Sequence, residues 1–160
     1  DNNIHYNEKV AASEMKTGFT NFAIANLLKS FGNLQNPVEE VLDFYFHQCS
    51  LEMTCEQLSN AFFPFANKGV CMQQNTCLTP TQAKRINAIM LTCGFYDEAG
   101  EFAFEVGLPG KSGVGGGIVA LLPDNFIITT WSPGLNEKGN SYLGMLALEK
   151  FTSATKASIF

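Results

Sequence analysis

The chain has 160 residues, of which 46% are hydrophobic and 16% charged, with a formal net charge of −5. This composition predicts one globular domain with a substantial core and excludes a disordered chain. The ten lysines and arginines are scattered, and neither a membrane-spanning apolar run nor a secretory signal is recognised. We therefore expect a cytoplasmic protein that binds neither nucleic acid nor membranes, and Asp1-Asn2-Asn3 resembles the interior of a longer polypeptide.

The first two-thirds of the chain predicts helices. Apolar residues near helical spacing favour a helix over residues 14–31, ended by Gly32, and Pro37 begins a second helix. Thr54 and Thr79 each begin a capping box with a glutamine three residues later, so further helices should run to about residues 69 and 94. Residues expected to face the interior of the first two helices are Phe19, Phe22, Ala23, Leu27, Leu28, Val38, Val41, Leu42, Tyr45 and Phe46.

After Gly94, taken as a helix C-cap, the period changes from helix to strand. Phe102, Phe104 and Val106 alternate with less apolar residues, which predicts a strand. Segments 117–122 and 126–131 flank a turn and should form an antiparallel hairpin, and Asn140 or Ser141 should cap a last helix. The expected fold class is α+β, with a helical part over about 10–94 and, over about 100–156, an antiparallel three-strand meander with a C-terminal helix.

Segment 106–117 places Lys111 and Ser112 among glycines, ahead of a β-branched strand. Glycines leave backbone N–H groups accessible, and a cation beside them suits an anion or an oxyanion. A phosphate-binding P-loop would need a glycine where Glu105 stands and a helix where a strand is predicted. Lys111-Ser112-Gly113 fits instead the lysine–serine/threonine–glycine strand of serine acyl-transfer enzymes.

The five cysteines, an odd number, form no C-x-x-C pair, and the two histidines give no zinc-ligand spacing. No metal or other cofactor is therefore expected. The cysteines are interpreted as reduced, mostly buried thiols of a cytosolic protein. His47 and Cys49 would face different directions on a helix, which argues against a catalytic pair.

A serine acyl-transfer enzyme also needs an S-x-x-K nucleophile, and two segments match that pattern. Ser13 and Lys16 form the first, but Ser13 is interpreted as the N-cap of a helix. Ser153 and Lys156 form the second, close to the C-terminus. Neither serine is predicted to be the nucleophile, so none is expected within this chain.

Three further positions carry groups that could bind an amino acid or move a proton. Glu14 and Asn21 are seven residues apart, on one face of the predicted helix, where they could hold an ammonium and a carboxylate or simply be solvated. Tyr96 lies in a tight turn before Lys111, and its phenol could donate a proton to a leaving group. Tyr45 and Tyr96 could equally be core residues, and Trp131 is interpreted as packing.

Blocks along nearly the whole chain resemble the serine-dependent glutaminases, whose fold is related to that of the β-lactamases and transpeptidases. Their number and common order make the resemblance specific. The blocks are Ala12-Ser13-Glu14, Asn21 to Ala25, Tyr45 with Gln48-Cys49-Ser50, Met53-Thr54-Cys55, Cys93 to Asp97, Phe102 to Phe104, Val106 to Val114, Ser132-Pro133 and Gly139-Asn140-Ser141.

The resemblance implies a role for particular residues. Glu14, Asn21, Tyr45 and Tyr96 stand where the family binds the charged groups of glutamine and surrounds its amide. The N–H of Val114 would be half of the oxyanion hole, Tyr96 would protonate the departing ammonia, and Lys111 would add positive charge. The implied reaction converts L-glutamine and water to L-glutamate and ammonia through a γ-glutamyl ester on serine.

The resemblance also implies a missing part, because the family's S-x-x-K serine and a substrate-binding asparagine belong to an N-terminal half that this chain does not contain. We therefore expect residues 1–160 to be the C-terminal half of a homo-oligomeric glutaminase, with L-glutamine and the N-terminal half as its partners. Two alternatives remain open: another serine acyl-transfer enzyme of the penicillin-recognising type, and a non-catalytic glutamine- or glutamate-binding module.

Overall fold

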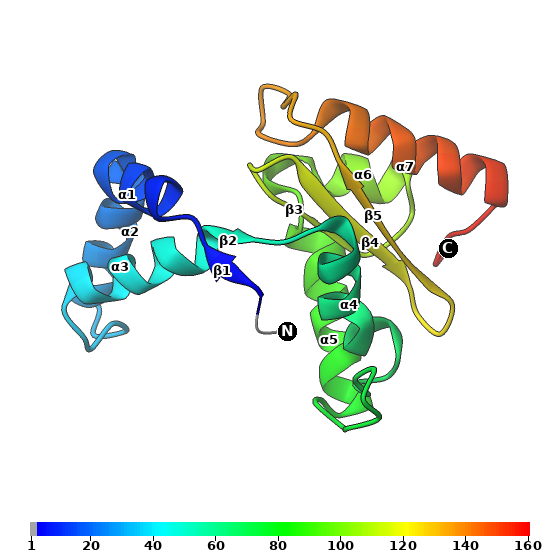
Figure 1. Cartoon of the computed structure of the whole chain (residues 1–160), viewed down its shortest axis with the longest axis horizontal. Coiled ribbons are helices and arrows are strands. Elements are labelled where there is room, and N and C mark those ends of the chain that lie inside the picture. Colours follow the sequence, from blue (N-terminus) through cyan, green and yellow to red (C-terminus); the bar gives the residue numbers. More distant parts are fainter. Residues whose placement is uncertain (1–2) are drawn as a thin grey trace. The chain divides into compact units, whose positions relative to one another are not determined.

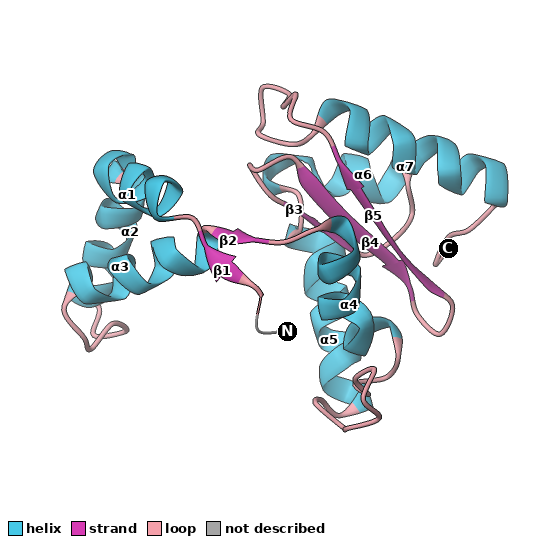
Figure 2. Cartoon of the chain, in the orientation of Figure 1, coloured by secondary structure: helices cyan, strands magenta, loops and turns pink. Residues whose placement is uncertain are grey.

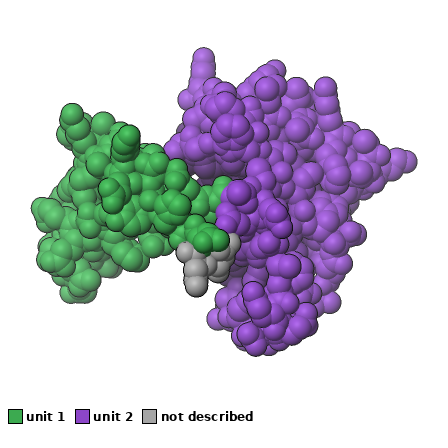
Figure 3. Space-filling view, viewed as in Figure 1, with its two compact units in different colours: residues 1–53 green, residues 54–160 purple. Residues whose placement is uncertain are grey.

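The computed structural model describes residues 3–160, which fall into two compact units. The first unit ends at Met53 and the second runs from Thr54 to Phe160 (Figure 3). None of the helices within residues 3–160 combines the length and the apolar character that crossing a membrane requires.

The first unit is a small helical bundle joined to a two-stranded ribbon (Figure 1). Helices α1 and α2 each pack against α3, and β1 pairs with β2 in antiparallel register. Ala25, Val38, Leu42 and Phe46 form its core. The elements are β1 (His5–Tyr6), α1 (Glu8–Thr17), α2 (Phe19–Ser30), α3 (Val38–Cys49) and β2 (Leu51–Glu52).

The prediction of one helix over residues 14–31 is wrong, because Gly18 divides it into α1 and α2. A Cβ at Gly18 would lie 2.5 Å from Cζ of Phe46 and 2.8 Å from the backbone oxygen of Glu14. The chain therefore turns where only glycine fits against Phe46. Ser13 is not an N-cap either: Asn7 caps α1 by accepting from the backbone of Lys9, and Ser13 lies inside the helix.

The predicted buried side of the first two helices is only partly correct. Val38, Leu42 and Phe46 are buried as expected. In contrast, Phe19, Leu27, Leu28 and Tyr45 are 78%, 57%, 43% and 47% exposed. With the helix broken at Gly18, α2 turns Ala25 and Phe22 towards α3 and leaves much of its apolar surface outside.

The second unit contains a three-stranded antiparallel sheet of order β3-β4-β5, with helices on both of its faces (Figure 2). Ile118 and Ala120 of β4 pack on one face with Phe102 and Leu148, and Leu121 packs on the other with Met90. The elements are α4 (Cys55–Ala66), α5 (Pro80–Cys93), the 3-10 turn η1 (Tyr96–Glu98), α6 (Ala99–Glu105), β3 (Gly110–Ser112), β4 (Gly117–Leu122), β5 (Phe126–Trp131) and α7 (Tyr142–Thr155).

Most predictions for this unit are confirmed. Thr54 and Thr79 form both capping boxes, β4 and β5 form the expected hairpin, and Ser141 caps α7. The α+β class, with an antiparallel three-strand meander and a C-terminal helix, is also confirmed. The first strand of the meander is β3, whose Lys111 pairs with Val119.

The predicted strand at residues 102–106 is wrong, because this segment belongs to helix α6. Phe102 and Val106 are buried, whereas Phe104 is 90% exposed. Buried residues four apart share one face of a helix, so the segment satisfies a helical period as well as an alternating one. The ring of Phe102 stacks on Phe95, with their centroids 3.6 Å apart.

The cysteines also differ from the prediction of reduced, mostly buried thiols. Cys71 and Cys77 form a disulfide across the loop between α4 and α5, with their Cα atoms 6.2 Å apart. The remaining three, Cys49, Cys55 and Cys93, are free and exposed. Cys71 and Cys77 are six residues apart in sequence and lie in a loop that folds back on itself, which brings the two side chains together.

Candidate active site

Lys111 lies on β3, one of the two edge strands of the sheet, with β4 rather than a helix following it. The absence of a helix N-terminus there rules out the P-loop alternative. Ser112 is buried, and its N–H and its hydroxyl both donate to the carbonyl oxygen of Gly94, at 3.1 and 3.3 Å. Strand β3 is thus fixed to the end of α5, directly before the turn that carries Tyr96.

Gly94 permits this close contact between α5 and β3. It is the C-cap of α5 as predicted, but in a right-handed conformation. A Cβ there would lie 1.9 Å from the carbonyl oxygen of Gly110 and 2.4 Å from that of Met90. The glycine is therefore required by the space between two backbones and not by a left-handed turn.

Tyr96 lies beside Lys111, as the sequence predicted. The ammonium nitrogen of Lys111 is 5.0 Å from the centroid of the Tyr96 ring, within the range of a cation–π interaction. That nitrogen also donates to the carbonyl oxygen of Ser112. Tyr96 has a φ of +50°, in the left-handed region that non-glycine residues rarely adopt, and its side chain remains about half exposed. Such backbone strain is common at functional sites.

Val114 lies in the turn between β3 and β4, and its N–H donates to no group among the described residues. The turn itself is closed by hydrogen bonds from Gly113 to Gly117 and from Gly116 to Gly113, each 3.0 Å long. Trp131 also holds it, because the indole N–H donates to the carbonyl oxygen of Gly115 at 2.9 Å. This rigid turn presents a backbone donor to any anion that reaches it.

Trp131 therefore differs from its prediction as a packing residue. Its side chain is 62% exposed and donates a hydrogen bond to the turn that carries Val114, instead of packing in the core. Sequence reasoning had no signal for this role, since Gly115 is 16 residues away.

The segment that joins β5 to α7 completes the surroundings of Tyr96. A Cβ built at Gly139 would lie 3.7 Å from Cγ1 of Val114 and 3.8 Å from Cε2 of Tyr96, so this glycine is next to both. The segment is held by Glu98, a buried carboxylate that accepts from the amides of Asn136 and Asn140. No sequence pattern marked Glu98, because its partners are 38 and 42 residues away.

The three predicted substrate-binding residues of the first unit lie on three helices. Glu14 is on α1, Asn21 on α2 and Tyr45 on α3. The argument that placed Glu14 and Asn21 on one face of one helix is wrong, because Gly18 separates them. Both side chains are partly buried, and Tyr45 packs edge-on against Phe46, with their centroids 5.7 Å apart.

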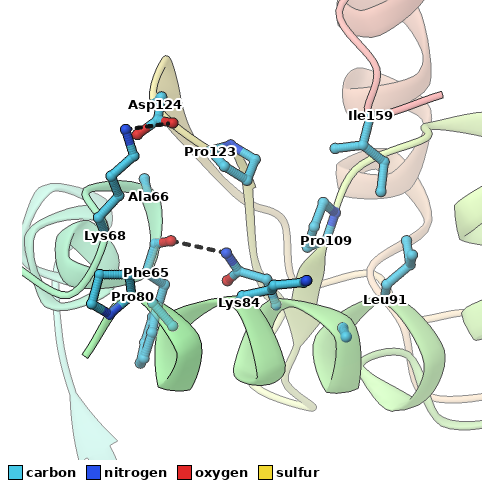
Figure 4. Close-up of a pocket in the computed structure, with 13 residues that line it drawn as sticks. Phe65, Ala66, Lys68, Pro80, Lys84, Leu91, Pro109, Pro123, Asp124 and Ile159 are labelled. Atoms are coloured by element: carbon cyan, nitrogen blue, oxygen red, sulfur yellow. Dashed lines mark hydrogen bonds and ion pairs between the residues drawn. The ribbon is translucent and has the colours of Figure 1, made fainter. Parts of the chain in front are cut away.

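A cavity of about 420 Å³ in the second unit contains none of the predicted site residues (Figure 4). It is lined mainly by apolar groups of α4, α5 and the β4–β5 turn, and an ion pair of 3.1 Å joins Lys68 to Asp124 at its edge. The chemistry-bearing residues Tyr96, Lys111 and Val114 thus lie outside it.

An edge strand that carries Lys111 and Ser112, followed by Gly113 and with Tyr96 beside it, is the arrangement expected of the lysine–serine/threonine–glycine strand in the serine acyl-transfer fold class. The glutaminase family model matches residues 1–160, and the chain belongs to the glutaminase family.

The relatives support the same family assignment. The chain is 62% identical to a glutaminase of Christiangramia forsetii and 55% identical to one of Agrobacterium fabrum, over all of this chain and 53% and 52% of those proteins. It thus spans about half the length of these curated relatives. Glutaminase YbgJ of Bacillus subtilis, solved as the covalent complex with 5-oxo-L-norleucine formed from 6-diazo-5-oxo-L-norleucine, matches with a TM-score of 0.93. It is 35% identical over 98% of this chain and 57% of YbgJ.

Proposed function

We propose that this chain supplies the glutamine-recognition and charge-stabilising half of a glutaminase, which hydrolyses L-glutamine to L-glutamate and ammonia. The observation that carries the proposal is the convergence of three groups at one end of the sheet: the Tyr96 ring, the Lys111 ammonium 5.0 Å from it, and the Val114 turn. The relative trapped with 5-oxo-L-norleucine supports it, since this molecule has a ketone where glutamine has its amide.

In this proposal the described residues act on the charge that develops at the amide. A serine oxygen attacks the amide carbon while its proton passes to the lysine of the same S-x-x-K. The Val114 N–H donates to the oxyanion that forms, and the N–H of that serine is the second donor. The positive charge of Lys111 favours the same intermediate. Tyr96 donates a proton to the nitrogen as the C–N bond breaks, so that ammonia leaves and a γ-glutamyl ester remains. Water then cleaves the ester to glutamate.

Binding of the substrate's α-ammonium and α-carboxylate groups is assigned to residues of the first unit. Glu14 supplies a carboxylate for the ammonium of glutamine, Asn21 supplies an amide for its carboxylate, and Tyr45 supplies a hydroxyl beside them. Their positions on α1, α2 and α3 support this, because α1 and α2 both pack against α3 in one bundle.

The nucleophile is assigned to the N-terminal part of the family's catalytic domain. Ser13 lies within α1, on the same helix as the proposed ammonium-binding Glu14, and Ser153 lies in the last turn of α7. Ser153, which belongs to the same unit as the Val114 turn, makes no described hydrogen bond to that turn. The catalytic S-x-x-K is therefore expected outside residues 1–160, which agrees with the chain spanning about half of its relatives.

We further propose a cytoplasmic homo-oligomer. The three free exposed cysteines favour a reducing compartment, whereas the disulfide between Cys71 and Cys77 favours an oxidising one, so thiol trapping in intact cells tests the location. The exposed apolar groups of α2 and of its C-cap residue support association, since Phe19 and Phe31 are 78% and 73% exposed. Light scattering on the purified protein tests that assembly.

The decisive test of the function is release of ammonia and glutamate from L-glutamine, with L-asparagine as the control substrate and intact mass to define the polypeptide assayed. Glutamine-selective turnover is expected from the intact protein. Acylation by a β-lactam without glutamine turnover would favour a penicillin-recognising enzyme instead. Binding of glutamine or glutamate without turnover by the intact protein would show a non-catalytic module.

A further inference from the structure

Glu98 is a buried carboxylate at the end of the turn that begins with Tyr96, and only 8% of it is exposed. The Nδ2 group of Asn136 donates to both of its oxygens, at 2.9 and 2.8 Å, and the Nδ2 group of Asn140 donates to Oε2. Lys138 adds an ammonium 3.9 Å from Oε1. All three partners belong to the segment that joins β5 to α7 (Figure 1).

These contacts hold a segment that is already folded upon itself. The backbone N–H of Asn136 donates to the carbonyl oxygen of Asn140 at 2.8 Å, and Oδ1 of Asn136 accepts from the backbone of Lys138 and of Asn140. Gly139, at the tip of this fold, is the residue next to Tyr96 and Val114. Glu98 thus holds this preformed segment next to Tyr96 and Val114.

Asn140 connects the same segment to the residues that precede and follow Tyr96 in the sequence. Its Nδ2 group donates to the carbonyl oxygen of Phe95, at 3.2 Å, and to Glu98, so the residues before and after the strained turn share one buried partner. A left-handed φ such as that of Tyr96 persists only where the surroundings enforce it. The bonds to Asn140 meet that requirement.

We infer that Glu98 is a positioning residue, which holds Tyr96 in its left-handed turn and Gly139 against it, so that the phenol stays directed at the leaving nitrogen. The inference rests on the proposed role of Tyr96. Glu98 does not touch the substrate in this scheme and acts through the amides of Asn136 and Asn140.

Glu98→Gln tests this with nearly unchanged shape. The glutamine amide keeps one acceptor oxygen but points its own N–H donors at the donors of Asn136 and Asn140, which breaks part of the network. In the intact protein we expect kcat for glutamine to fall about ten- to hundred-fold, the range that a small misplacement of a catalytic group can cost. The KM should change less.

A double substitution separates positioning of Tyr96 from a general loss of structure. Once Tyr96→Phe has removed the phenol, adding Glu98→Gln should lower kcat no further, whereas a merely structural role would lower kcat in both backgrounds. Asn136→Ala removes the hydrogen-bond donor of the same contact and should lower kcat in the same way as Glu98→Gln. Glu101→Gln is the matched control: it also lies 3.9 Å from the Lys138 ammonium but holds none of the amides, and should keep wild-type kcat.

Amide hydrogen exchange tests, independently of activity, whether Glu98 holds the Tyr96 turn and the segment between β5 and α7. Glu98→Gln should accelerate exchange in residues 95–98 and 132–141 together, and Glu101→Gln should not. Unchanged exchange in Glu98→Gln, or an additive loss of kcat with Tyr96→Phe, would overturn the inference. Wild-type protein without glutamine turnover would contradict the proposed function instead, and the exchange data would still decide whether Glu98 holds the turn.

Discussion

Replacing Phe102 by alanine should be among the most destabilising single changes in the second unit. Phe102 is 1% exposed, stacks on Phe95 with centroids 3.6 Å apart, and belongs to the core that includes Leu148 of α7. Truncating such a phenylalanine removes its transfer free energy and leaves a cavity, at a cost of about 3–5 kcal/mol. Against a total stability of roughly 5–15 kcal/mol, this should shift a urea unfolding curve far to lower concentration.

Phe104→Ala is the matched control, with the same side chain two residues further along α6. Phe104 is 90% exposed, so its removal should change the free energy of unfolding by less than about 0.5 kcal/mol. On a strand, residues 102 and 104 would share one face and both would be costly. Comparable losses for the two variants in urea denaturation of the intact protein would therefore refute the helical assignment of α6.

Three further variants test the site in steady-state kinetics with glutamine. Tyr96→Phe removes the proposed proton donor and should lower kcat about a hundred-fold or more while KM changes little; an unchanged kcat would remove Tyr96 from the mechanism. Glu14→Gln loses a charge-assisted contact to the substrate ammonium and should raise KM roughly ten- to hundred-fold, and an unaltered KM would mean a merely solvated residue. Trp131→Phe keeps the ring but loses the hydrogen bond to Gly115, so kcat should fall about three- to ten-fold; wild-type kcat would show that the Val114 turn needs no such support.

Local signals in the sequence were sufficient for much of the second unit. The capping boxes at Thr54 and Thr79 place a hydroxyl and a glutamine on the first turn of their own helices, so no distant residue is needed to form them. The β4–β5 hairpin is similarly local, since its turn directly connects paired strands. Such features could be predicted because the interacting groups are close in sequence.

The two wrong element assignments depend on distant contacts. Whether residues 102 and 106 face a core through a helix or a strand is decided by Phe95, Ile118 and Leu148, which no local period reveals. The break at Gly18 is likewise set by Phe46, which is 28 positions further on and occupies the space that a side chain would need. Hydrophobic spacing alone therefore predicted one continuous helix.

The candidate site follows the same division. Lys111-Ser112-Gly113 could be recognised as an edge-strand motif because its three residues are contiguous and a strand follows. The residues that hold the site in place could not be recognised from the sequence, because their contacts are distant. Gly94 contacts Gly110, 16 positions away, and Glu98 accepts a hydrogen bond from Asn140, 42 positions away. The first contact fixes the edge strand to the end of α5, and the second fixes the Tyr96 turn to the segment between β5 and α7. The family resemblance indicated which groups would do chemistry, whereas the fold explains how a strained tyrosine and an open backbone N–H are kept in place for it.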